Sequence, residues 1–137
     1  MTPGIRPLIA GNWKMNGTAR EAASLADAVR QGAGAVTGAV DLLVCPPFVH
    51  IHAASAAIAF QPIAVGAQDC SPREKGAHTG DVSAPMLADA GCAYVILGHS
   101  ERRADHGETD ALVKAKAEAA IAAGLIPIVC VGESLAQ

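Results

Sequence analysis

The sequence predicts a parallel α/β fold, on two observations. Short apolar segments, too short for buried helices and rich in β-favouring residues, recur five times along the 137 residues. They begin near residues 8, 41, 63, 93 and 126, with helix-forming sequence between them. Apolar strands that alternate with helices at this spacing indicate right-handed βαβ units and a parallel sheet. In such sheets, catalytic residues gather at the C-terminal ends of the strands.

The composition is that of one domain, and we expect residues 1–137 to form it: 51% of the residues are hydrophobic and 17% are charged. The net charge of −3 gives no general support for nucleic-acid binding. The sequence has no secretory signal and no run of about 18 apolar residues that would form a membrane helix. We therefore expect a cytoplasmic protein with neither a nucleic-acid nor a membrane partner.

The cysteines form no C-x-x-C pair, so they give little support for a zinc or redox site. We expect four buried, reduced thiols, and neither a metal nor another cofactor. The four lie far apart in the sequence, at Cys45, Cys70, Cys92 and Cys130.

The first strand, residues 7–14, begins apolar and ends polar. Asn12 and Lys14 are two positions apart, so on a strand their side chains point to the same side. An amide beside an ammonium group would form an anion site, although a solvated strand end remains the alternative for a lone lysine. Thr18 and Glu21 then have the spacing of a capping box. The helix that they begin should end near residue 32, and its apolar face comprises Ala22, Leu25, Ala26 and Val29.

The second and third strands are residues 41–45 and 63–67, with an alanine-rich helix at about residues 50–60 between them. His50 and His52 cannot share a face of that helix, so we interpret them as surface residues and not as metal ligands. The polar segment 70–81 follows the third strand. It is longer than the roughly two to six residues usual for a βα loop, and loops of that length commonly have a function. Ser83 should then cap a short helix.

The fourth strand, Tyr94–Leu97, is followed by an abrupt change to polar sequence after Gly98. His99 supplies an imidazole, and Ser100 could cap a turn whose first residues include Glu101. Because a histidine just before a helix N-terminus lies at the positive end of the backbone dipoles, we expect a neutral ring that can donate a hydrogen bond. An ordinary surface histidine at a strand exit is the alternative.

A last helix, from about residue 108 to 123, leads to the fifth strand, residues 125–131. Polar side chains thus follow the strand ends, which favours a catalytic site at one rim of the sheet. These residues are Asn12, Lys14, Gln68, His99, Glu101 and Glu133.

Three segments together resemble the triosephosphate isomerase family in sequence, order and spacing: residues 11–17 (GNWKMNG), 98–103 (GHSERR) and 130–133 (CVGE). Residues 76–81 (GAHTGD) also look like the long third loop of that family. The resemblance covers essentially the whole chain. It implies a TIM (β/α)8 barrel, of which about five βα units are present.

The resemblance implies the interconversion of dihydroxyacetone phosphate and glyceraldehyde 3-phosphate through an enediol or enediolate, in glycolysis and gluconeogenesis. Asn12 and Lys14 would contact the phosphorylated triose and its developing oxyanion. His99 would polarise the carbonyl and move a proton, and Glu101 would position Lys14 and support the proton transfers. This family is itself the standard example of a neutral histidine that works with a glutamate base.

The family is dimeric, and the resemblance implies a homodimer formed through the loop 70–81. The tip of that loop would approach the active site of a second subunit, and an aspartate–arginine pair would cross the interface. The residues expected at this contact are Met15, Thr79, Gly80, Asp81 and Arg102, of which the last two form the pair.

In the family, the glutamate base, the closing lid and two glycine-rich phosphate loops all lie beyond the fifth strand of a barrel of about 250 residues. Glu133 cannot be that base, because it matches the glutamate of the CVGE motif. We therefore expect residues 1–137 alone to be inactive.

Two other hypotheses come from different classes of protein. A non-catalytic half-barrel could bind phosphate or assemble with a partner, because five open strands would expose two unpaired edges and an uncovered inner face. A zinc deaminase is suggested by the H-x-E of residues 99–101. It is excluded because the segment around Cys130 lacks the P-C-x-x-C partner motif.

Overall fold

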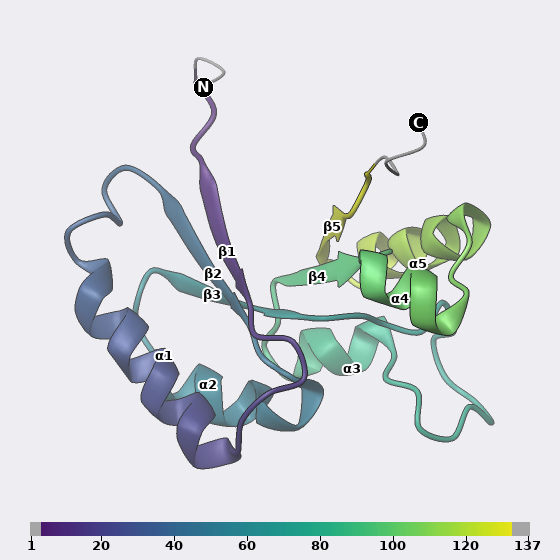
Figure 1. Cartoon of the computed structure of the whole chain (residues 1–137), viewed down its shortest axis with the longest axis horizontal. Helices are drawn as coiled ribbons and strands as arrows, with labels where there is room; N and C mark the ends of the chain where they lie inside the picture. Colours follow the sequence, from purple (N-terminus) through teal and green to yellow (C-terminus); the bar gives the residue numbers. More distant parts are fainter. Residues whose placement is uncertain (1–3, 133–137) are drawn as a thin grey trace.

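The computed structural model describes residues 4–132 and contains a five-stranded sheet in the order β1-β2-β3-β4-β5. Every neighbouring pair of strands is parallel, as the sequence predicts. The sheet curls into part of a barrel, with the helices on its outer side (Figure 1). The strands are β1 (Leu8–Asn12), β2 (Asp41–Cys45), β3 (Ile63–Ala67), β4 (Tyr94–Leu97) and β5 (Ile126–Val129).

Two of the helices, α1 and α3, begin at the residues that the sequence predicts as caps, Thr18 and Ser83. The Thr18 side chain accepts the Glu21 N–H, and the Glu21 carboxylate accepts the Thr18 N–H, which confirms the capping box. Ser83 and Thr109 cap two further helices. The helices are α1 (Ala19–Ala33), α2 (Ile51–Ala57), α3 (Ala84–Asp89), α4 (Ser100–His106) and α5 (Asp110–Ala122), with a 3₁₀ turn, η1 (Phe48–His50), before α2.

Two apolar clusters lie on opposite faces of the sheet, because successive strand residues point to opposite sides. The larger one fills the space between the strands and the helices and includes Val44, Val65 and Leu97. The smaller one lines the inner side of the curl and is built on Leu43, Cys45 and Ile96. The edge strands are far more exposed than the central strands.

Two expectations about the helices between β1 and β3 are wrong. Leu25 is 47% exposed, because α1 packs on its smaller residues, Ala22, Ala26 and Ala33, and Leu25 lies at the margin of that face. His50 is half-buried instead of lying on the surface. Its Nε2–H donates to the Gly17 carbonyl at 2.9 Å, so it connects the start of α2 to the loop before α1. His52 is exposed, as expected.

The four cysteines are free thiols, and three of them are buried. Burial raises the pKa of Cys45 to about 12 and the pKa of Cys70 and Cys92 to about 11, so these thiols stay protonated at neutral pH. No helix in the described range, residues 4–132, has the length and apolarity to cross a membrane.

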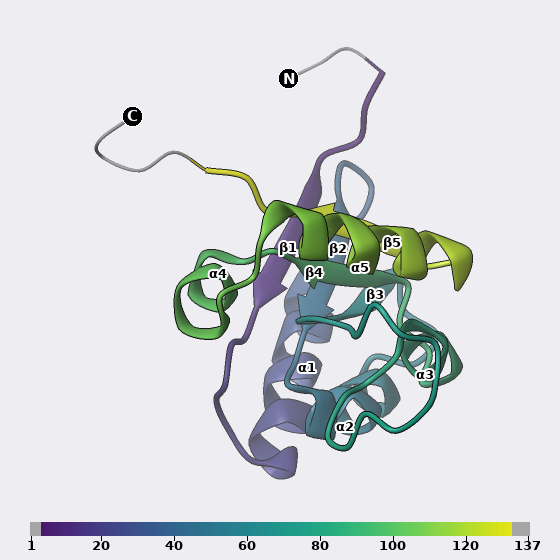
Figure 2. The same cartoon turned by 90° about the vertical axis from the view of Figure 1, so that its right-hand side faces the viewer.

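The loop between β3 and α3 projects from the body of the fold (Figure 1), and Figure 2 shows the same loop from the side on which it projects. A hydrogen bond joins the two ends of this loop: the Ser71 N–H donates to the Val82 carbonyl at 2.8 Å. The Ser71 hydroxyl also donates to the Asp81 carboxylate at 3.0 Å. Residues 73–80 between these anchors are exposed.

Candidate active site

The ends of β1 and β4 bring the predicted site residues together at one rim. Lys14 Nζ lies 2.5 Å from Glu101 Oε1, although the two residues are 87 positions apart. His99 Nδ1 lies 3.4 Å from the other oxygen of the same carboxylate. The Asn12 side chain contacts the same group of residues by accepting a hydrogen bond from the Lys14 N–H. Glu133, the remaining strand-end candidate, lies outside the described residues.

Lys14 owes its position to an unusual backbone conformation rather than to strand alternation. The strand ends at Asn12, and Lys14 has φ of 54°, in the left-handed region that non-glycine residues rarely adopt. The sequence predicts that the side chains of Asn12 and Lys14 share a strand face. That prediction is wrong, because the strand ends at Asn12 and Lys14 lies beyond it. Two side-chain amides hold the strained residue. Asn12 Oδ1 accepts the Lys14 N–H at 3.0 Å, and Gln68 Nε2 donates to the Lys14 carbonyl at 2.8 Å.

His99 itself caps α4, so Ser100, expected as the cap, is the first helical residue instead. The Glu101 N–H donates to His99 Nδ1 at 3.3 Å. A nitrogen that accepts a backbone N–H carries no proton, so this contact favours the tautomer with its proton on Nε2. The neutral imidazole that the sequence predicts stays a prediction, in which Nε2–H is the group that donates to a ligand.

Glu101 is a carboxylate well suited to hold a cation. The hydrogen bond from Lys14 lowers the pKa of Glu101, with a smaller contribution from the charges nearby. Both side chains are about half exposed, at 52% for Lys14 and 50% for Glu101. The ammonium group is therefore fixed in place yet accessible to an anion from solvent.

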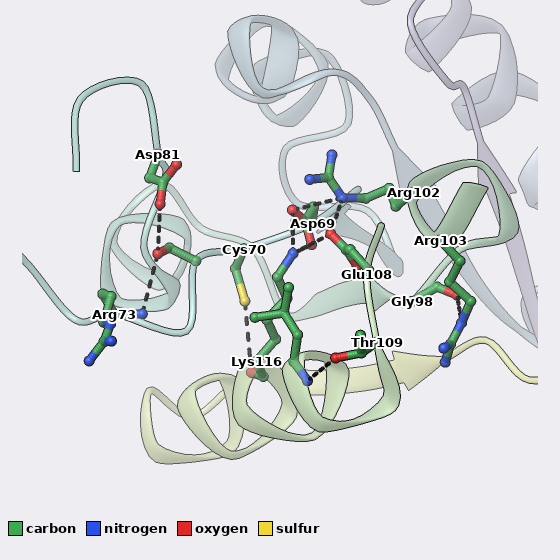
Figure 3. Close-up of polar contacts among 12 residues, drawn as sticks. Asp69, Cys70, Arg73, Asp81, Gly98, Arg102, Arg103, Glu108, Thr109 and Lys116 are labelled. Carbon is green, nitrogen blue, oxygen red and sulfur yellow. Dashed lines mark hydrogen bonds and ion pairs between the residues drawn. The ribbon is translucent and has the colours of Figure 1, made fainter. Parts of the chain in front are cut away.

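A second cluster of charges, which the sequence did not predict, joins Asp69, Arg102, Glu108 and Lys116 (Figure 3). Lys116 on α5 is 4% exposed and donates to both oxygens of Asp69, at 2.8 and 2.9 Å, and to Glu108 at 2.5 Å. Arg102 Nε lies 2.6 Å from Glu108 and 3.0 Å from Asp69. Two carboxylates and two cations thus compensate one another in the interior. The available sequence signal was a lysine within the apolar stripe formed by Val113, Lys116 and Ala120.

The two carboxyl groups of this cluster respond differently to burial. Burial raises the pKa of Asp69 against the opposing effect of Lys116 and Arg102. Burial acts on Glu108 as well, but hydrogen bonds from Lys116 and Arg102 outweigh it and lower the pKa of Glu108. Glu108 Oε2 is buried and has no hydrogen-bond partner among the described residues.

Three of the residues predicted at a subunit contact, Gly80, Asp81 and Arg102, line a cavity beside this cluster. A cavity of about 370 Å³ is lined by Gly80, Asp81, Arg102 and Glu108, among others. Within the single chain, Asp81 accepts from Ser71, and Arg102 is bound to Asp69 and Glu108. Met15, in the loop after β1, is 93% exposed.

The chain is similar to triosephosphate isomerases. A family model described as triosephosphate isomerase matches residues 7–137. The chain is 62% identical over 136 residues to the triosephosphate isomerase of Afipia carboxidovorans, covering 98% of this chain and 54% of that protein. It is 59% identical over 137 residues to that of Bradyrhizobium diazoefficiens, covering 100% of this chain and 54% of that protein.

A solved structure gives the same result. The crystal structure of triosephosphate isomerase from Bartonella henselae superposes with a TM-score of 0.86 at 44% identity, covering 96% of this chain and 54% of that one. The chain therefore spans about half the length of the relatives that it matches.

Proposed function

The chain belongs to the triosephosphate isomerase family, and we propose that the whole protein interconverts dihydroxyacetone phosphate and glyceraldehyde 3-phosphate through an enediol or enediolate. The observation that carries this proposal is the convergence of Lys14, Glu101 and His99 at one rim of the sheet. We further infer a glycolytic and gluconeogenic role in the cytoplasm.

Lys14 and Asn12 bind the substrate in this proposal. The ammonium group of Lys14 attracts the phosphate and the oxyanion that develops on the carbonyl oxygen. Its exposed fraction of 52% supports this role, because an anion can reach it while Glu101 keeps it in place. The Asn12 amide holds the backbone of Lys14 at 3.0 Å and contacts the substrate beside it.

His99 is the electrophile and proton carrier. Its Nε2–H polarises the carbonyl, which makes the proton on the neighbouring carbon easier to remove, and it then moves a proton between the two oxygens of the enediol. A preorganised donor aimed at a developing oxyanion stabilises the transition state by roughly 3 kcal/mol. The bond from the Glu101 N–H to Nδ1 supports this role, because it leaves the proton on the nitrogen that must donate.

The remaining catalytic parts come from outside the five βα units. In this proposal, residues 1–137 form a single folding domain, the N-terminal portion of a TIM barrel. The glutamate base, the lid and the phosphate loops follow it in the whole protein. Residues 1–137 alone then bind part of the substrate at most and do not turn it over.

We infer that the whole protein is a homodimer. The projecting loop 70–81, with Thr79 and Gly80 at its exposed end, inserts beside the partner's active site, and Met15 lies at the same contact. Asp81 and Arg102 form the proposed pair between subunits. Arg102 Nε is already bound within the chain, so the new contact uses the terminal guanidinium nitrogens.

The competing function is a non-catalytic half-barrel that binds phosphate or assembles with a partner. The exposed apolar residues on its edge strands favour it, with Ile9 at 56% and Ile126 at 53% exposed. The deciding experiment is a coupled assay of the full-length protein with dihydroxyacetone phosphate. Turnover that disappears in His99→Gln supports the isomerase. A well-folded full-length protein that binds phosphate without turnover supports the binding module.

A further inference from the structure

Both carbonyl groups that flank His99 are held by one residue, Arg103. The Arg103 backbone N–H donates to the His99 carbonyl at 3.0 Å. The Arg103 side chain donates from Nε to the Gly98 carbonyl at 2.8 Å, a contact visible in Figure 3. The Gly98 carbonyl and the His99 N–H belong to the same planar peptide unit. The two bonds therefore restrain the backbone of His99 from both sides.

The peptide before His99 needs such a restraint, because glycine restricts its own backbone angles little and residue 98 is a glycine. Its φ of +66° lies in the left-handed region, where glycine is favoured. A Cβ there would lie 2.9 Å from Val113 Cγ2 and 3.0 Å from Arg103 Nη2, so packing also excludes a side chain. The residue that fits this position is the one with the greatest conformational freedom. The hydrogen bond from Arg103 limits that freedom.

The guanidinium group has a second partner in Asp110, whose side chain is 95% exposed. Arg103 Nη1 donates to Asp110 Oδ1, at the start of α5, at 2.7 Å. The Arg103 side chain is 31% exposed, so solvent competes less for it than for the fully exposed basic residues. The hydrogen bonds from Arg103 to Gly98 and Asp110 thus join the end of β4 to the start of α5.

We propose that Arg103 is a positioning residue that aims the His99 imidazole at the substrate by fixing the peptide before it. This inference rests on the proposed function, in which His99 acts on the carbonyl. Arg103 has its own bonded partners in Gly98, His99 and Asp110, and it acts through His99. A misplacement of about 1 Å in a catalytic group can cost about a hundredfold in rate.

The test measures kcat and KM for full-length Arg103→Met, which keeps an apolar stem and loses the donors. We expect kcat to fall by about tenfold to a hundredfold while KM changes by less than about threefold, since substrate binding by Lys14 is untouched. Arg103→Lys keeps one cationic donor and should recover part of the lost kcat. The matched control is Arg30→Met, which breaks the Arg30–Asp27 pair on α1 and should leave kcat unchanged.

Arg103→Gln is made alongside as a milder change, in case the methionine variant does not fold. A folded Met or Gln variant, with a native circular dichroism spectrum and unchanged kcat, contradicts the inference. If neither variant folds, Arg103 serves the whole fold and the inference is equally wrong. His99→Gln in the same assay separates the two proposals. If it leaves kcat intact, the proposed function itself fails, whereas a crippled His99→Gln beside a fully active Arg103→Met removes only the positioning role.

Discussion

Lys14 Nζ and the Glu101 carboxylate lie 2.5 Å apart and join the loop after β1 to the first turn of α4. The same carboxylate lies 3.4 Å from His99 Nδ1, and the Glu101 N–H donates to that nitrogen. Glu101 therefore contacts both the cation and the imidazole of the proposed isomerase site.

Lys14→Ala in the full-length protein should lower kcat/KM for dihydroxyacetone phosphate by at least about a hundredfold, because it removes the charge that stabilises the developing oxyanion. Lys114→Ala is the control, since Lys114 is an exposed lysine of α5 in a long 3.8 Å pair with Glu118. Unchanged kcat/KM in Lys14→Ala would count against the assignment of the substrate site.

His99→Gln should lower kcat by about a hundredfold or more with a modest effect on the melting temperature. The imidazole supplies the proposed Nε2–H donor, whereas the fold uses only its capping bond to the Glu101 N–H. His52→Gln, on the exposed side of α2, is the matched control. Loss of the folded state, rather than of activity, would show that His99 is a structural histidine.

Lys116→Met should lower the free energy of unfolding at pH 7 by about 3 kcal/mol, because it leaves the buried carboxylates of Asp69 and Glu108 with Arg102 as the one cation of the cluster. Urea denaturation measures this loss, and Lys114→Met on the same helix is the control. Destabilisation no greater than that of the control would mean that the buried cluster does not depend on Lys116.

The same variant has a predicted pH dependence. Burial already raises the pKa of Asp69 in the wild type, against the opposing hydrogen bond from Lys116. Without Lys116 the pKa of Asp69 rises further, so the folded variant binds this proton more readily than the unfolded chain and regains stability as the pH falls from 7 to 5. In the wild type, the pKa of Glu108 is lowered. The contribution of Glu108 to the free energy of unfolding is therefore present above the pKa of the unfolded chain, about 4.3, and is lost only as the pH falls below that value. The difference between the two proteins should shrink at pH 5, and a constant difference would contradict this account.

Met15→Glu should weaken the proposed homodimer, because it buries a charge at the contact beside loop 70–81. Light scattering coupled to size-exclusion chromatography should show a shift towards monomer as the protein is diluted. Phe60→Glu replaces another fully exposed apolar residue, after α2, and should leave the assembly unchanged. A Met15→Glu protein that stays dimeric at every concentration would exclude Met15 from the interface.

Residues 1–137 expressed alone should show no appreciable isomerase turnover in a coupled assay, while the full-length protein should reach the range of ordinary enzymes, about 1–1,000 per second. The reason is that no residue of the five βα units matches the family's glutamate base. Turnover by residues 1–137 in that range would mean that a residue within them removes the proton.

The sequence by itself determined the parallel α/β architecture, because its signals are local. The lengths of the apolar segments, the Thr18–Glu21 capping box and the Ser83 cap depend on residues a few positions apart, and all three are present in the structure. The strand ends also brought Asn12, Lys14 and His99 to one rim, since parallel strands place their C-terminal ends together.

The tertiary structure decided how those residues are held, because the contacts join distant parts of the chain. The left-handed Lys14 is held by Gln68, 54 positions away, and its ammonium group by Glu101, 87 positions away. The buried pair of Lys116 and Asp69 likewise spans 47 positions. A helical pattern marks Lys116 as lying on a buried face, but only the packing of α5 against the end of β3 supplies the carboxylate that makes its burial possible.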